Sequence, residues 1–186
     1  MVLLCTVVII DTVQLVQTSV ALMGDATHPP QSASHCFLFE RDFVGSWRCI
    51  PLCVRRKLDL IGLKLKLSHW LELSLEQRQT LVDWPDTPEA LHRLRDHLRD
   101  CTRPMADGMA KDLPPVTDAP WQRQDQLPPE VQQAARARTM TISLEQWALL
   151  SELERFALCK LVRPGHDHHN LAAAFNEVMA LSLIHI

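Results

Sequence analysis

The chain has 186 residues, of which 47% are hydrophobic and 22% charged, and its formal net charge at pH 7 is −3. Such a composition is typical of a domain that buries a core, so disorder throughout the chain is excluded. A net charge so close to zero excludes a global field that attracts nucleic acid or an anionic membrane surface. Six cysteines without the spacing of a disulfide framework indicate free thiols and a cytoplasmic location.

We expect both ends of the chain to lie outside the folded domain. Residues 1–22 are largely apolar but carry internal polar residues and no preceding basic segment, so they do not fit a signal peptide and leave a membrane span only as a weak alternative. Because Met23 opens a polar stretch, we interpret residues 1–22 as a non-native extension, residues 23–36 as a flexible arm and residues 37–180 as a single domain. Residues 181–186 match the translation of a transposon-end adapter used in sequencing libraries, and we assign them no function.

The first part of the domain contains an aromatic run, a helix and a strand in chain order. Residues 36–40 are predicted to form an edge strand or an anchor for the arm. Residues 51–61 begin with proline, present an apolar face and are followed by Gly62, which is typical of a helix and its stop signal. Apolar and charged residues then alternate over residues 62–67, which predicts a short strand. We expect this strand to pair with residues 139–142.

A motif written twice, Trp-x-x-Leu-Ser-x-x-(Gln/Glu)-Arg, is the most informative feature of the sequence. The two copies are 77 residues apart (147 − 70 = 77). In each copy a serine with Gln or Glu three residues later fits a capping box, so each copy predicts a short helix, a tight turn and a longer helix. We expect each tryptophan to pack across the turn and each arginine to bind a carboxylate or a helix end. The repeated residues are Trp70, Ser74, Arg78, Trp147, Ser151 and Arg155.

Further helices and one irregular connection complete the predicted architecture. Residues 88–101 place leucines on one face of an amphipathic helix. Residues 103–127 carry four prolines and few periodic apolar positions, which indicates a long irregular connection, with a partner-binding strap as one interpretation. A helix over 129–138 and a last helix capped by Asn170 follow. The predicted fold is mainly α: a compact helical domain with two pseudo-repeated helix–turn–helix units and a short two-stranded β pairing.

Two groups of side chains invite interpretation as a metal site. His166, His168 and His169 are the densest group of potential ligands, and Cys49 and Cys53 stand one helical turn apart. No Cys-x-x-Cys pair or His-Glu-x-x-His motif completes a ligand set. Unpaired cysteine usually behaves as a small buried hydrophobe. We therefore expect no metal and no cofactor, and a small metal- or thiol-binding carrier protein stays as an alternative.

Basic residues concentrate between positions 48 and 66. A solvated helix and strand face is the plainest interpretation of such a run. A nucleic-acid-binding regulator is the alternative, but stacking aromatics are expected beside the charges in that case, and Trp47 and Trp70 are better explained as core. The sequence shows no Gly-rich phosphate loop and no recognisable nucleophile, base and acid, so we expect no nucleic-acid partner and no enzymatic activity. The basic residues are Arg48, Arg55, Arg56, Lys57, Lys64 and Lys66.

Segments spread along the chain resemble one known family. Residues 37–43 (Phe-Leu-Phe-Glu-Arg-Asp-Phe), 48–51 (Arg-Cys-Ile-Pro), 62–67 and much of 145–164 together resemble the nitrate reductase associated protein family, and the resemblance covers about residues 37–178. Members are small proteins of cyanobacteria, some other bacteria and plants. They are often encoded beside genes for assimilatory nitrate reductase and the molybdenum cofactor. The family has no established catalytic residues to carry over.

The resemblance implies a non-catalytic accessory protein that binds assimilatory nitrate reductase or its maturation machinery. Its role is then to support the assembly, cofactor loading or activity of the reductase in nitrate assimilation. Matching polar and charged positions within the resembling segments are the best candidates for the partner surface. We take these to be Arg48, Arg55, Arg56, Arg163, His166 and Asn170.

Overall fold

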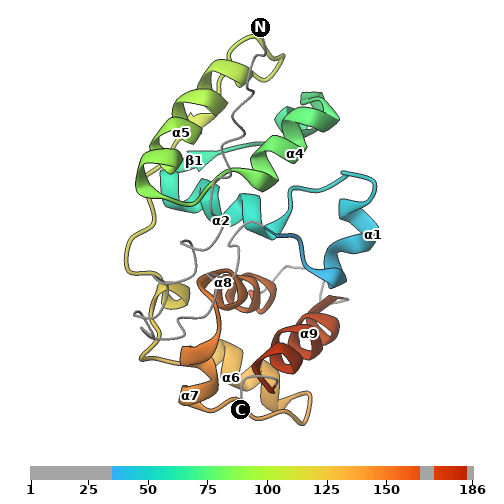
Figure 1. The fold of residues 1–186 in the computed structure, drawn as a ribbon, viewed down its shortest axis with the longest axis vertical. Helices are drawn as coiled ribbons and strands as arrows, with labels where there is room; N and C mark the ends of the chain where they lie inside the picture. Colours follow the sequence, from blue (N-terminus) through green and yellow to red (C-terminus); the bar gives the residue numbers. More distant parts are fainter. Residues whose placement is uncertain (1–34, 164–169, 184–186) are drawn as a thin grey trace, which may run out of the picture.

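The structure is a computed structural model that describes residues 35–163 and 170–183. Within these residues the chain is mainly helical, which confirms the predicted fold class (Figure 1). The expected extension 1–22, nearly all of the arm 23–36, and residues 184–186 lie outside the described residues. The boundaries expected there stay predictions.

Two helices occupy the centre of the fold. Helix α2 (Leu52–Ile61) packs against α8 (Glu152–Leu161). Helices α4 (Leu75–Asp83) and α5 (Pro88–Thr102) lie on the α2 side, and α6 (Pro129–Arg136), α7 (Leu144–Leu149) and α9 (Leu171–Leu183) lie on the α8 side (Figure 1). Because α2 is covered by several elements at once, even charged residues of this helix lie inside the protein.

The repeated motif is confirmed as a repeated structure. Helices α3 (Leu67–Glu72) and α4 form the first unit, and α7 and α8 form the second. The linking leucines have nearly the same backbone angles, φ −65° and ψ 143° at Leu73 and φ −63° and ψ 144° at Leu150. Ser74 and Ser151 then cap the longer helices, as the motif predicts.

The two-stranded pairing exists, but the predicted partner is wrong. Strand β1 (Leu63–Lys64) pairs antiparallel with β2 (Lys111–Asp112) in the irregular connection. Residues 139–142 instead complete the end of α6, because Thr139 adopts φ 56° and the Met140 N–H donates to the carbonyl of Ala135 at 3.0 Å. This backbone angle and this hydrogen bond are typical of a helix C-terminus, so the segment is not available for strand pairing.

The aromatic run at 36–40 forms no edge strand. It contains a short 3₁₀ helix, η1 (Leu38–Glu40), followed by α1 (Arg41–Val44). Element η1 contacts α9, so the run anchors the start of the described chain to its last helix. This outcome matches the second of the two interpretations that the sequence left open.

The connection between the repeats is mostly irregular, as its prolines predict. It contains β2 and a 3₁₀ helix, η2 (Pro120–Gln122), which packs on α8. Trp121 of η2 is buried, and its ring meets that of Phe156 edge-on with centroids 5.2 Å apart. The connection is therefore part of the core and not a strap free of it.

Candidate functional site

Two adjacent charged residues of α2 are buried in the interior of the protein. Arg56 is 6% exposed and Lys57 is 0% exposed. Interior charges are tolerated only when they are paired and hydrogen-bonded, so the partners of these two side chains define the site. The position of Arg56 leaves it little surface to offer to a partner protein. The basic run from 48 to 66 is thus not a uniformly solvated face.

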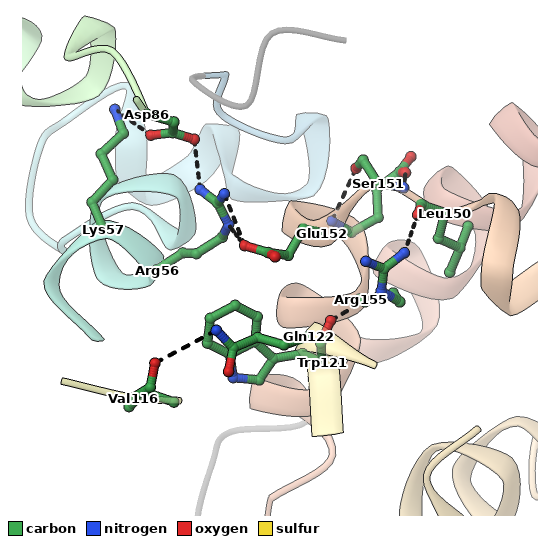
Figure 2. Close-up of polar contacts among 11 residues, drawn as sticks. Arg56, Lys57, Asp86, Val116, Trp121, Gln122, Leu150, Ser151, Glu152 and Arg155 are labelled. Atoms are coloured by element: carbon green, nitrogen blue, oxygen red, sulfur yellow. Dashed lines mark hydrogen bonds and ion pairs between the residues drawn. The ribbon is translucent and has the colours of Figure 1, made fainter. Parts of the chain in front are cut away.

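Arg56 joins three parts of the fold through two carboxylates. Its Nη1 lies 2.6 Å from Asp86 Oδ2, in the link between α4 and α5. Its Nε and Nη2 both lie 3.0 Å from Oε1 of Glu152, the first residue of α8 (Figure 2). A carboxylate is favoured at a helix N-terminus, where the helix dipole is positive. We call Arg56, Lys57, Asp86 and Glu152 the charged junction.

Lys57 ties the end of α4 to α2. Its Nζ donates to the carbonyl of Leu81 at 3.1 Å and to that of Val82 at 2.8 Å, and it lies 3.9 Å from Asp86 Oδ1. Carbonyls in the last turn of a helix lack intrahelical partners, so an ammonium group there satisfies them. Burial lowers the pKa of Lys57, whereas the charge of Asp86 opposes that shift. The lysine acts as a helix C-cap supplied from a neighbouring helix.

The repeated arginines bind helix ends and not carboxylates. Arg78 donates from Nε to the Trp70 carbonyl at 2.8 Å and from Nη2 to the Leu71 carbonyl at 2.7 Å, both in the last turn of α3. Arg155 donates from Nη1 to the carbonyl of Leu150, directly after α7. Each arginine therefore closes the turn between the two helices of its repeat. The helix-end alternative of the sequence analysis is confirmed.

The repeated tryptophans reach back to the segment that precedes each repeat. The Nε1 of Trp70 donates to the carbonyl of Trp47 at 2.9 Å, and the Nε1 of Trp147 donates to the carbonyl of Arg123 at 2.9 Å. Both tryptophans are fully buried. Arg155 also donates from Nε to the carbonyl of Trp121 at 2.9 Å (Figure 2). In each repeat the motif thus fixes a distant loop as well as its own turn.

A buried carboxylate joins the start of the described chain to α2. Glu40 is 0% exposed, and its carboxylate accepts hydrogen bonds from the N–H of Phe37 at 3.2 Å and from that of Leu52 at 2.9 Å. Leu52 is the first residue of α2, so Glu40 caps that helix from another element. Burial raises the pKa of Glu40 to about 7, against the lowering effect of these two bonds.

A second carboxylate binds the same segment from the opposite end of the sequence. Glu177 of α9 accepts hydrogen bonds from the N–H of Leu38 at 2.8 Å and from that of Phe39 at 2.9 Å. Residues 35–40, which we call the η1 segment, are therefore held between α2 and α9. Neither carboxylate was predicted from the sequence, although Glu40 stands within a segment that carries the family resemblance.

A pair of thiols meets within the described part of the chain, and it differs from the pair considered in the sequence. The Sγ atoms of Cys36 and Cys53 lie 4.0 Å apart. Cys53 is completely buried and Cys36 is half-buried. The hydrogen bond between the thiols lowers the pKa of Cys36 and raises that of Cys53. Cys49 is half-buried, and Cys53 has Cys36 as its thiol neighbour.

The other candidate surface residues are more accessible than Arg56. Arg48 is exposed, with Nε 2.9 Å from the hydroxyl of Ser46, and Arg163 is exposed after α8. Arg55 is half-buried and donates from Nε to the Ile50 carbonyl at 2.8 Å. Asn170 is half-buried before α9, and His166 lies outside the described residues.

The histidines of the expected ligand group, His166, His168 and His169, lie outside the described residues. In residues 35–163 and 170–183, no three His, Cys, Asp or Glu side chains gather closely enough to hold a metal ion. No helix in the same ranges is both long and apolar enough to cross a membrane.

The fold and the contacts define a small helical protein whose repeated units and buried charges fasten distant segments together. The sequence profile of the family described as conserved nitrate reductase-associated protein matches residues 36–178, and the chain belongs to that family. The match runs from the η1 segment into α9. Neither a comparison with curated proteins nor one with solved structures found a match.

Proposed function

We propose that this protein is a non-catalytic accessory protein that binds assimilatory nitrate reductase and supports its assembly, cofactor loading or activity. Membership of the nitrate reductase-associated family, over nearly all of the described chain, carries the proposal. The charged junction agrees with a non-catalytic role. Its polar groups bind backbone and side chains of the same protein. We place the protein in the cytoplasm together with the reductase.

We propose that the partner surface includes Arg48, which precedes α2, and Arg55, in the first turn of α2. Arg48 is exposed, and the half-buried Arg55 is held by the Ile50 carbonyl. Guanidinium groups at an interface favour acidic or phosphate-bearing surfaces and raise the rate of association. The nucleic-acid alternative is less favoured, because Arg56 and Lys57 are directed into the protein and leave the basic run divided.

Co-expression with the cognate reductase tests the accessory role. The reductase is produced with and without the full chain, and nitrate reduction per amount of reductase protein is measured together with its molybdenum content. Higher activity and higher molybdenum content would indicate a role in cofactor loading. Higher activity at equal molybdenum content would indicate a later step. If neither quantity changes, the proposed function is contradicted.

A charge-changing variant tests the proposed surface. We expect Arg48→Glu/Arg55→Gln to bind purified reductase roughly tenfold more weakly, because like charge at an interface slows association. Its melting temperature should stay within a few degrees of the parent protein. The matched control is Arg93→Glu/Arg136→Gln, which makes the same change in net charge at exposed positions of α5 and α6. Equal binding by both variants would place the interface elsewhere.

A further inference from the structure

We propose that Cys36 and Cys53 form a reversible disulfide that pins the η1 segment covalently to α2. The two sulfur atoms are 4.0 Å apart, which is van der Waals contact for a pair of thiols. Neither residue belongs to the repeated motif or to the charged junction. The inference concerns the thiols alone and does not depend on the proposed accessory role.

The backbone beside each of the two cysteines is held in place by Glu40. Glu40 accepts from the N–H of Phe37, next to Cys36, and from the N–H of Leu52, next to Cys53. One buried carboxylate therefore holds the immediate neighbours of both cysteines. A disulfide bond is about 2.05 Å long, so the sulfur atoms need to approach by about 2 Å. Rotation of the Cys36 side chain can bring the two sulfur atoms together, because Cys36 is half-buried and lies outside regular structure.

The surroundings give the two thiols different roles. Cys36 has surface that a small reagent can reach, whereas Cys53 has none. The hydrogen bond from Cys53 and, less strongly, the charge of Lys57 lower the pKa of Cys36, whereas burial and the charges of Glu40 and Asp83 raise it. The net pKa shift is downward and favours the thiolate. Because the thiolate is the attacking species in disulfide exchange, Cys36 is the first to react. Cys53 then resolves the mixed disulfide.

The reaction needs an oxidant, which we assign to a small-molecule disulfide such as glutathione disulfide. The Cys36 thiolate attacks one sulfur of the reagent, forms a mixed disulfide and releases one glutathione thiolate. The sulfur of Cys53 attacks the Cys36 sulfur, and the second glutathione leaves with the proton that Cys53 loses. Two cysteine sulfurs are oxidised, and one glutathione disulfide is reduced to two glutathione molecules. Added dithiol reverses the reaction.

The bond would add a covalent link between the η1 segment and α2, which the hydrogen bonds of Glu40 already hold together. It closes a loop between residues 17 positions apart and fixes the η1 segment to α2. The same segment binds Glu177 of α9, so oxidation also stabilises the contact between the start of the described chain and the last helix. Closing such a loop should raise the melting temperature by roughly 5–10 °C.

Equilibration of the full chain in glutathione redox buffers tests the proposal. A Cys5→Ser/Cys49→Ser protein serves as background, because Cys49 and Cys53 otherwise occur on one tryptic peptide. After alkylation, mass spectrometry should show the loss of two thiols and a peptide linking Cys36 to Cys53. The oxidised protein should melt roughly 5–10 °C higher than the same sample reduced with dithiothreitol. Wild-type protein should yield the same melting shift.

Two variants and an unfolded control make the result decisive. In the same background, Cys36→Ser and Cys53→Ala should each lose the linked peptide and the melting shift. Because Cys53 is buried and its variant can destabilise the fold, the half-buried Cys36 provides the independent readout. When the protein is oxidised in guanidinium chloride, the peptide that links Cys36 to Cys53 should no longer be the most abundant disulfide-linked product. The proposal is overturned if both thiols stay open to alkylation in oxidising buffer, if Cys36 stops at a glutathione adduct, or if another pair dominates in the native protein.

Discussion

Glu40 is a carboxylate without solvent exposure, and the backbone N–H groups that it binds come from two different elements. Its pKa is raised to about 7 because burial disfavours the charged form more than the two hydrogen bonds and Arg55 favour it. Glu177 adds a repulsive charge from α9. At the scale of one residue, this side chain couples the stability of the η1 segment to pH.

We expect Glu40 to make the protein less stable as pH rises from about 4.3 toward its folded-state pKa of about 7. The folded-state pKa of about 7 lies above the unfolded value, so folding favours the protonated form. The resulting stability is full below pH about 4.3 and is lost as pH rises through the folded pKa. Relative to Glu40→Gln, wild type should lose about 2–3 kcal/mol of unfolding free energy between pH 5 and pH 8. Urea unfolding at several pH values measures this difference.

Only the slope of the difference carries this prediction, because the amide of Gln also alters the hydrogen bonds to Phe37 and Leu52. Histidines and other titrating groups common to both proteins cancel in the comparison. Parallel stability profiles for the two proteins would show that Glu40 does not titrate in this range.

Helix α2 ends at Gly62, where the chain meets the irregular connection closely. Gly62 has φ 61°, and an added Cβ would lie 2.3 Å from the carbonyl oxygen of Leu113 and 2.6 Å from the nitrogen of Pro115. The Leu113 N–H also donates to the Gly62 carbonyl at 2.9 Å. At the scale of elements, Gly62 ends α2 and allows close packing of the irregular connection that contains β2.

We expect Gly62→Ala to destabilise the protein by about 3 kcal/mol or more, because both backbone strain and steric overlap oppose it. The matched control is Gly108→Ala, which also has positive φ (69°) but has nothing within 4 Å of an added Cβ. Strain alone should cost about 1–2 kcal/mol there. Chemical denaturation of both variants separates the two effects. Equal losses would show that the close approach at Gly62 is relaxed in solution.

The charged junction acts at the scale of the whole molecule, because it connects the two repeats through α2. Arg56 reaches Asp86 beyond α4 and Glu152 at the start of α8, two carboxylates far apart in sequence. The side chains of Arg56 and Asp86 are 7% and 16% exposed, so water screens their contact less than that of a surface ion pair. Glu152 is about one-third exposed, so solvent screens its share.

We expect Arg56→Met to lower the unfolding free energy by about 3 kcal/mol, because it leaves the mostly buried Asp86 side chain without its closest cation. Adding Asp86→Asn and Glu152→Gln to this variant should restore part of the loss. The control is Arg95→Met, which removes a half-exposed pair with Asp112 and should cost less than about 1 kcal/mol. Similar costs for Arg56→Met and Arg95→Met would show that the junction is not a major source of stability.

Local chemistry made much of the helical architecture predictable. Ser74 and Ser151 each cap a helix by accepting a hydrogen bond from the backbone N–H three residues later, and Gly62 ends α2 through its own backbone angle. The family resemblance was also readable, because its motifs are ordered along the chain and the family profile matches residues 36–178. These features need only the residue types and their spacing.

Tertiary structure alone decided which distant groups meet. The sequence shows β1 but not its pairing with β2, since alternation specifies a strand and leaves its neighbour open. It shows the charges of Arg56 and Lys57 but not their burial, which depends on Asp86 and Glu152, the latter 96 residues from Arg56. Contacts over such separations arise from packing of whole helices. Spacing within the chain therefore determines the elements, and packing between them determines the sites.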